Sequence, residues 1–123
     1  MWCFTRQGFY AAVQHNDDPD LIIVRTRTKE DMVATGWPYI ETPDFDYGFR
    51  ATISRDLWVS FVADAAADVD YPSFKSSLDD PDRYDVYFDV WLALLKLQPP
   101  GWGRYTPAGT IRAVKPAKKP VAP

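Results

Sequence analysis

The first half of the chain alternates hydrophobic and polar residues with the two-residue period of β-strands. Residues 2–15 read as two strands joined by a turn at residues 6–8, and residues 21–27 read as a third strand rich in β-branched side chains. A short strand over residues 38–42 and a longer one over residues 47–53 follow. In the last strand the alternation places on one face Tyr47, Phe49, Ala51 and Ile53. The pattern therefore predicts about four or five strands.

The spacing of hydrophobic residues changes to the helical period in the second half of the chain. Ser54 is placed to cap a helix that ends near Val69, and Asp80 is placed to cap another helix that runs to about Gln98. A shorter helix over residues 28–36 precedes the fourth strand. This order of elements predicts an α+β fold, in which a small antiparallel sheet packs against two to four helices.

The C-terminal segment differs from the rest in composition and in charge. Residues 99–123 hold six of the 11 prolines and three of the six glycines, which predicts a Pro/Gly-rich tail after a single domain of residues 1–98. The tail has five basic residues and no acidic one, whereas residues 1–98 have nine basic and 17 acidic residues, a net charge of −8. The net charge of −3 for the whole chain therefore hides an acidic body and a basic tail.

Several features bear on the cellular location. The sequence has no run of 18 apolar residues that could cross a membrane, and its first residues lack the pattern of a signal peptide. Cys3 is the only cysteine, so no internal disulfide can form. We expect a protein of the reducing cytoplasm, or of the host cytoplasm if a phage encodes it, with no membrane contact.

No catalytic motif stands out, because GxSxG, P-loop and GxGxxG patterns are missing from the sequence. His15, the only histidine, lies near Asp17, Asp18 and Asp20, but this spacing is typical of a polar turn and falls short of a usual zinc set. Cys3 lies in an apolar strand, where thiols are usually inert. We assign no catalytic, cofactor-binding or metal-binding residue and expect no cofactor. A metal-dependent hydrolase or nuclease that uses aspartates and His15 is an alternative.

A basic stripe could form on the predicted sheet. Arg25, Arg27 and Arg50 lie at alternating strand positions, and Tyr10 or Tyr39 nearby would make a stacking surface for single-stranded nucleic acid. The net charge of −8 in the body opposes phosphate binding, which favours a solvated sheet face. The tail adds three candidate nucleic-acid contacts, Lys115, Lys118 and Lys119.

Aromatic residues in segments that read as loops or tail form a candidate partner surface. They are Trp37, Tyr39, Phe45, Trp102 and Tyr105. Joint exposure of Trp37 and Phe45 would mark a binding site, whereas burial of these rings would mean that they fill the core. The sequence supports both interpretations equally.

The stretch DYPSFK, residues 70–75, separates the two longer helices and concentrates two aromatic rings, a proline and a charge pair. Pro72 disfavours the helical conformation at Tyr71, and Ser73 can cap the helical turn that follows. We interpret the stretch as a structural corner between helices that pack on the same sheet, in preference to a recognition loop. This interpretation predicts that Phe74 is buried, so that Phe74→Ala would cost roughly 3–5 kcal/mol.

Five segments occur in an order that resembles a known family. They are MWCFTRQGFYAAVQ, VRTRTKEDM, FRATISRDLWVSF, VDYPSFKSSL and YDVYFDVWLALLKL. Over residues 1–97 the chain is similar to small uncharacterised proteins of bacteria and their phages, especially actinobacteria and their phages. The most specific pieces are the opening MW-FT--GFY pattern and DYPSFK. The resemblance implies a setting and no activity, cofactor or catalytic residue.

These observations favour a small non-enzymatic cytoplasmic module that binds and regulates a protein of a host or of its phage. The hypothesis depends on the absence of a catalytic constellation in the sequence, on the spare aromatic residues and on the opposed charges of body and tail. Nucleic-acid binding and metal-dependent hydrolysis remain alternatives. They differ in what the structure must show, since an enzyme needs a polar cleft and a nucleic-acid binder needs a basic stripe.

Overall fold

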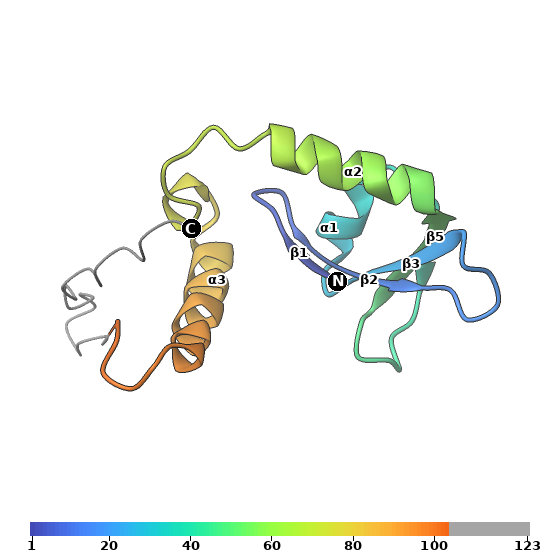
Figure 1. Cartoon of the computed structure of the whole chain (residues 1–123). Coiled ribbons are helices and arrows are strands. Elements are labelled where there is room, and N and C mark those ends of the chain that lie inside the picture. The colour runs from blue at the N-terminus through green and yellow to red at the C-terminus, as the bar shows by residue number, and fades with distance from the viewer. Residues whose placement is uncertain (104–123) are drawn as a thin grey trace, which may run out of the picture. The chain divides into compact units, whose positions relative to one another are not determined.

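The computed structural model describes residues 1–103, which divide into two compact units (Figure 1). The first unit is Met1–Pro72 and the second begins at Ser73. Each unit is described by itself below. The boundary between them falls inside DYPSFK, and the single domain over residues 1–98 stays a prediction.

The first unit contains a five-stranded sheet in the order β1-β2-β3-β5-β4, in which every neighbouring pair is antiparallel. The strands are β1 (Trp2–Phe4), β2 (Phe9–Gln14), β3 (Leu21–Thr26), β4 (Ile40–Glu41) and β5 (Phe49–Ser54). This sheet, together with the helices described below, confirms the predicted α+β class. The predicted strand over residues 38–42 shrinks to two residues at the edge of the sheet, because proline at position 38 cannot donate a ladder hydrogen bond.

Two helices of the first unit lie on one face of this sheet (Figure 1). They are α1 (Lys29–Val33) and α2 (Arg55–Ala67). Both begin at a capping hydroxyl: that of Thr28 accepts the N–H of Asp31, and that of Ser54, the cap that the sequence predicts, accepts the N–H of Leu57. Asp68 forms the C-cap of α2, close to the predicted end of this helix.

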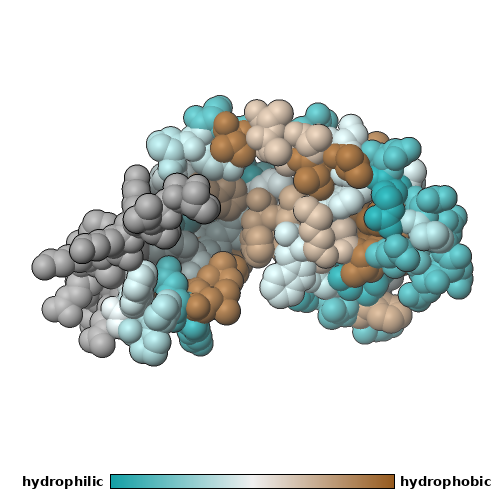
Figure 2. Space-filling view, viewed as in Figure 1, coloured by the Kyte–Doolittle hydropathy of each residue, from teal (hydrophilic) through white to brown (hydrophobic). Residues whose placement is uncertain are grey.

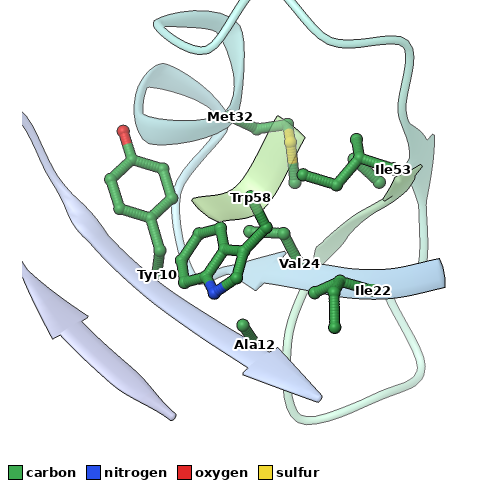
Figure 3. Close-up of a cluster of buried hydrophobic side chains, with 8 residues drawn as sticks. Tyr10, Ala12, Ile22, Val24, Met32, Ile53 and Trp58 are labelled. Carbon is green, nitrogen blue, oxygen red and sulfur yellow. The ribbon is translucent and has the colours of Figure 1, made fainter. Parts of the chain in front are cut away.

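Hydrophobic side chains from the sheet and from both helices form the core of the first unit (Figure 3). The strands contribute Tyr10, Ala12, Ile22, Val24, Ala51 and Ile53, and the helices contribute Met32 and Trp58. Phe61 of α2 stacks on Trp58 with ring centres 5.5 Å apart. Because successive side chains of a strand alternate between faces, this list defines the covered face of the sheet and leaves the intervening residues on the other face.

The second unit contains α3 (Pro81–Leu94), preceded by a short 3-10 helix, η1 (Lys75–Ser77), and followed by another, η2 (Leu95–Leu97). The carboxylate of Asp80 accepts the N–H of Asp82 at 2.9 Å, as the sequence predicts for an N-cap followed by proline. Lys75 lies over the ring of Trp91, with Nζ 3.6 Å from the ring centre. The last described residues, 98–103, follow η2.

The aromatic residues of DYPSFK belong to different units. Tyr71 lies under the guanidinium of Arg6 in the first unit, whereas Phe74 stacks on Tyr87 of α3 with ring centres 5.6 Å apart. Ser73 accepts the N–H of Ser76 at 3.5 Å, near the predicted capping position. Phe74 is half-buried rather than buried, which corrects the expected cost of Phe74→Ala to about 1–3 kcal/mol, because less apolar area leaves water.

Candidate binding face of the sheet

One face of the sheet in the first unit points away from α1 and α2, and we call it the open face. It is formed by the strand residues that alternate with the core residues, namely Trp2, Phe4, Phe9, Ala11, Val13, Ile23, Arg25, Ile40, Arg50 and Thr52. Within residues 1–72, no helix lies on this side. The open face is therefore a surface of this unit that its own helices leave uncovered.

A single row of paired residues crosses the open face from one edge of the sheet to the other. The successive partners are Trp2, Ala11, Arg25, Arg50 and Ile40. The two ends of the row are widely exposed, at 69% for Trp2 and 64% for Ile40. The row thus places two arginines between apolar side chains that water reaches.

Three arginines gather in the middle of the open face and at its border, and we call Arg25, Arg27 and Arg50 the arginine cluster. The ring of Tyr47, itself only 5% exposed, lies 4.6 Å from the guanidinium carbon of Arg25 and 4.1 Å from that of Arg27. Both distances suit cation–π attraction. Tyr47 therefore holds two of the guanidinium groups in place.

Nε of Arg25 donates to the carbonyl of Ala11 at 3.5 Å, and the loop between β4 and β5 supplies further contacts of the cluster. Asp46 forms an ion pair with Arg50 at 3.3 Å, and its carbonyl accepts a hydrogen bond from Nη1 of Arg27. The ring of Phe45 lies 5.0 Å from the guanidinium carbon of Arg50. Nε of Arg50 is buried and has no hydrogen-bond partner in the described part of the chain.

Aromatic rings occupy the other end of the open face. Phe9 contacts Trp2 edge-on at 6.2 Å between ring centres and contacts Phe4 at 4.6 Å. These three rings come from the paired strands β1 and β2. All three rings belong to the alternating pattern of residues 2–15. That pattern has two similar apolar faces, and the sequence alone does not show which of them the helices cover.

The structure brings Arg25, Arg27 and Arg50 together, as the basic-stripe hypothesis requires. The expectation that Tyr10 or Tyr39 would stack beside this stripe is wrong. Tyr10 is fully buried in the core, and Tyr39 packs against the core on the covered face. The sequence pattern also predicts the wrong face of the sheet for Tyr47. The ladder of β5 begins only at Phe49, so Tyr47 packs on the arginines of the open face and takes no part in the core around Ile53.

The aromatic residues proposed as a partner surface separate in the structure. Trp37 is half-buried, packs against the core and contacts Phe61 at 5.0 Å between ring centres. Phe45 is 65% exposed, so the two rings are not exposed together. Trp102 is exposed as well, in the second unit. Tyr105 and the candidate nucleic-acid contacts Lys115, Lys118 and Lys119 lie outside the described residues.

His15 and its neighbouring aspartates form a polar turn between β2 and β3, seen as a hydrophilic area at the right of Figure 2. Nδ1 of His15 accepts the N–H of Asp17, and Asp18 accepts the N–H of Asp20. Across residues 1–103, no three His, Cys, Asp or Glu side chains form a group that could hold a metal ion. The turn is thus organised by its own backbone.

Cys3 lies on β1 and is half-buried against the core. Burial raises the pKa of its thiol above the ordinary value, because removal from water disfavours the thiolate. A nucleophilic cysteine needs the opposite shift. The environment of Cys3 thus supports a structural role.

None of the helices described in residues 1–103 is both long and apolar enough to cross a membrane. A scan against protein-family models, a search of the curated proteins and a search of the solved structures each find no match to this chain. The geometry of the open face is therefore the basis on which a function is proposed.

Proposed function

We propose that the chain is a small, non-enzymatic protein-binding module that docks a partner protein on the open face of its sheet. The observation that carries this proposal is the row from Trp2 to Ile40, in which two arginines and the buried Ala11 lie between two exposed apolar side chains. Tryptophan and arginine are enriched among the residues that dominate binding energies at protein interfaces. An uncovered apolar and cationic face on a rigid sheet is the arrangement that such interfaces use.

The setting of this binding follows from the resemblance of residues 1–97 to small proteins of actinobacteria and their phages. We propose that the chain is encoded by such a phage and regulates a host or phage protein in the host cytoplasm. The single cysteine, which has no second cysteine in the chain with which to form a disulfide, fits a reducing compartment. The net charge of −6 of the first unit, residues 1–72, limits nonspecific contact with nucleic acid.

A tagged pull-down from an actinobacterial host tests the proposal when it is combined with a matched pair of surface variants. Ile40→Glu places a charge on the open face, whereas Val59→Glu places the same charge on the exposed surface of α2. Capture of the same protein by the wild type and by Val59→Glu, and its loss with Ile40→Glu, would support docking on the open face. Equal capture by both variants, or no specific partner under any condition, would count against it.

Nucleic-acid binding is a second candidate, because Arg25 and Arg50 are directly opposed on the open face. It predicts an affinity for single-stranded oligonucleotides that falls steeply with salt concentration. A binding isotherm for an oligothymidylate at two salt concentrations distinguishes it from protein binding. A salt-independent isotherm rejects this candidate.

A further inference from the structure

We propose that the partner segment is acidic and that its carboxylates bind the arginine cluster, Arg25, Arg27 and Arg50. This inference rests on the proposed docking to the open face and adds the chemistry of the occupant. Four observations carry it: the distribution of charge, the arrangement of the guanidinium groups, the length of the row, and the burial of Tyr47.

Charge is separated between the open face and the rest of the first unit. Residues 1–72 contain six basic and 12 acidic residues, and the arginine cluster accounts for half of the basic ones. Asp46 is the one carboxylate that the described residues place in an ion pair with this cluster. The cluster thus keeps an excess positive charge on an otherwise acidic unit, which is complementary to an acidic segment and opposed to a basic one.

The guanidinium groups are arranged before any partner arrives. Tyr47 lies against both Arg25 and Arg27, and Phe45 lies against Arg50. These contacts restrain the guanidinium groups, and each group carries five N–H donors, more than its bonds to the carbonyl of Ala11 or to Asp46 use, so donors are left for a carboxylate. Nε of Arg50 lacks an acceptor among residues 1–103, and a carboxylate could satisfy it after a rotation of the side chain.

The row across the sheet sets the length and the pattern of the segment. Five strands spaced about 4.8 Å apart span roughly 19 Å, the length of about 13 residues of α-helix. Trp2 and Ile40 lie at the two ends and the arginines lie between them. The matching segment has acidic side chains at its centre and apolar side chains toward its ends.

A nucleic acid fits this face less well than an acidic peptide. The ring nearest to two of the arginines, that of Tyr47, is only 5% exposed and offers bases little surface for stacking, although the rings of Trp2 and Phe45 are exposed, so charge decides between the two ligands. Tyr10 and Tyr39 lie on the covered side. The phosphates of a nucleic acid are also repelled along the whole strand by the net charge of −6 of residues 1–72. A short acidic segment lies mainly against the arginine cluster.

The experiment is a selection of random 16-residue peptides on the full chain, carried out in parallel on the wild type and on variants. We expect Asp and Glu to be enriched severalfold in the selected peptides. The double variant Arg25→Gln/Arg50→Gln should bind the selected peptides roughly a hundredfold more weakly, since each lost charge-assisted hydrogen bond weakens binding about tenfold. Lys29→Gln removes one positive charge from α1 on the covered side, as Arg50→Gln alone removes one from the cluster, and Lys29→Gln should leave the affinity unchanged.

The outcomes separate this inference from the function that it refines. Peptides without acidic enrichment that lose binding with Ile40→Glu would overturn the acidic chemistry and keep the docking face. Peptides whose affinity is changed neither by Ile40→Glu nor by Arg25→Gln/Arg50→Gln would overturn the acidic chemistry and the docking face together. Stronger binding of oligothymidylate or oligouridylate than of any peptide, lost in the arginine variant, would overturn the acidic peptide in favour of nucleic acid. If the double variant unfolds, Arg50→Gln alone and the salt dependence of the wild-type affinity decide the question.

Discussion

Arg25 lies directly opposite Arg50 in the antiparallel pairing of β3 with β5. Like charges at opposed positions destabilise a sheet, so this pair needs compensation from its surroundings. The loop between β4 and β5 provides it, because Tyr47 lies 4.6 Å from the guanidinium carbon of Arg25 and Asp46 forms an ion pair with Arg50 at 3.3 Å. The loop therefore stabilises a cationic surface that the strands alone would oppose.

Replacement of Tyr47 tests this role of the loop. Tyr47→Leu removes a buried ring that two guanidinium groups contact, and we expect it to lower the free energy of unfolding by about 1–3 kcal/mol. Urea denaturation followed by circular dichroism measures the change. Tyr47→Phe keeps the ring and should cost clearly less. A double-mutant cycle with Arg27→Met should show a coupling of about 0.5–1 kcal/mol, and zero coupling would contradict the stacking.

Asp31 connects α1 to the β1–β2 hairpin, and its removal should be costly. Its carboxylate, in a residue only 3% exposed, accepts the N–H of Phe9 at 3.0 Å, while its carbonyl accepts the hydroxyl of Tyr10 at 2.9 Å. Asp31→Ala leaves the partly buried N–H of Phe9 without this acceptor, which should lower the free energy of unfolding by about 1–3 kcal/mol. The measurement is urea denaturation of the full chain.

Two variants that, like Asp31→Ala, each remove one negative charge serve as its controls. Asp31→Asn retains an oxygen acceptor and should recover part of the lost stability. Glu30→Ala changes the exposed neighbour and should stay within about 0.5 kcal/mol of the wild type. A loss from Glu30→Ala as large as that from Asp31→Ala would show that the removal of a negative charge from the first turn of α1, and not the hydrogen bond, is responsible.

The hairpin turn before β2 has room only for glycine. A Cβ atom at Gly8 would lie 2.6 Å from Cγ of Asp31 and 2.9 Å from the hydroxyl oxygen of Tyr10. Both atoms belong to buried residues, so Gly8→Ala should lower the free energy of unfolding by about 1–3 kcal/mol through overpacking. Gly48→Ala is the matched control, since its Cβ would meet the Arg27 carbonyl oxygen at 3.8 Å, an ordinary contact. Equal stability of the two variants in denaturation would refute the steric argument.

The local elements of this fold could be predicted from the sequence because their signals are local. Ser54 and Asp80 cap helices through contacts two or three residues away, and the alternating pattern identifies the longer strands. The face of the sheet that the helices cover could not be predicted. Phe9 and Tyr10 are both aromatic, so alternation alone does not decide which of them enters the core.

The contacts that define the open face depend on long-range pairing. Arg25 and Arg50 are 25 positions apart, and their opposition follows from the register of β3 with β5. The position of Tyr47 depends on where the ladder of β5 begins, which strand propensity does not fix to within one residue. The role of Asp31 as a buried hydrogen-bond acceptor could not be predicted from the sequence either. In the sequence, Asp31 looks like the second residue of a weak capping box.

The reactivity of Cys3 should report on the folded state as pH changes. Burial raises the pKa of this thiol, so the folded chain holds the proton more tightly than the unfolded chain does. Folding is therefore favoured at pH values below the ordinary cysteine pKa of about 8.5, and this contribution is lost as pH rises through the raised folded value. With a single cysteine in the chain, an aromatic disulfide reagent measures the thiolate directly across pH 7 to 10. We expect a midpoint above that of the same chain in denaturant, where the reaction should also be faster, and a midpoint at or below the denatured value would show that the thiol is not desolvated.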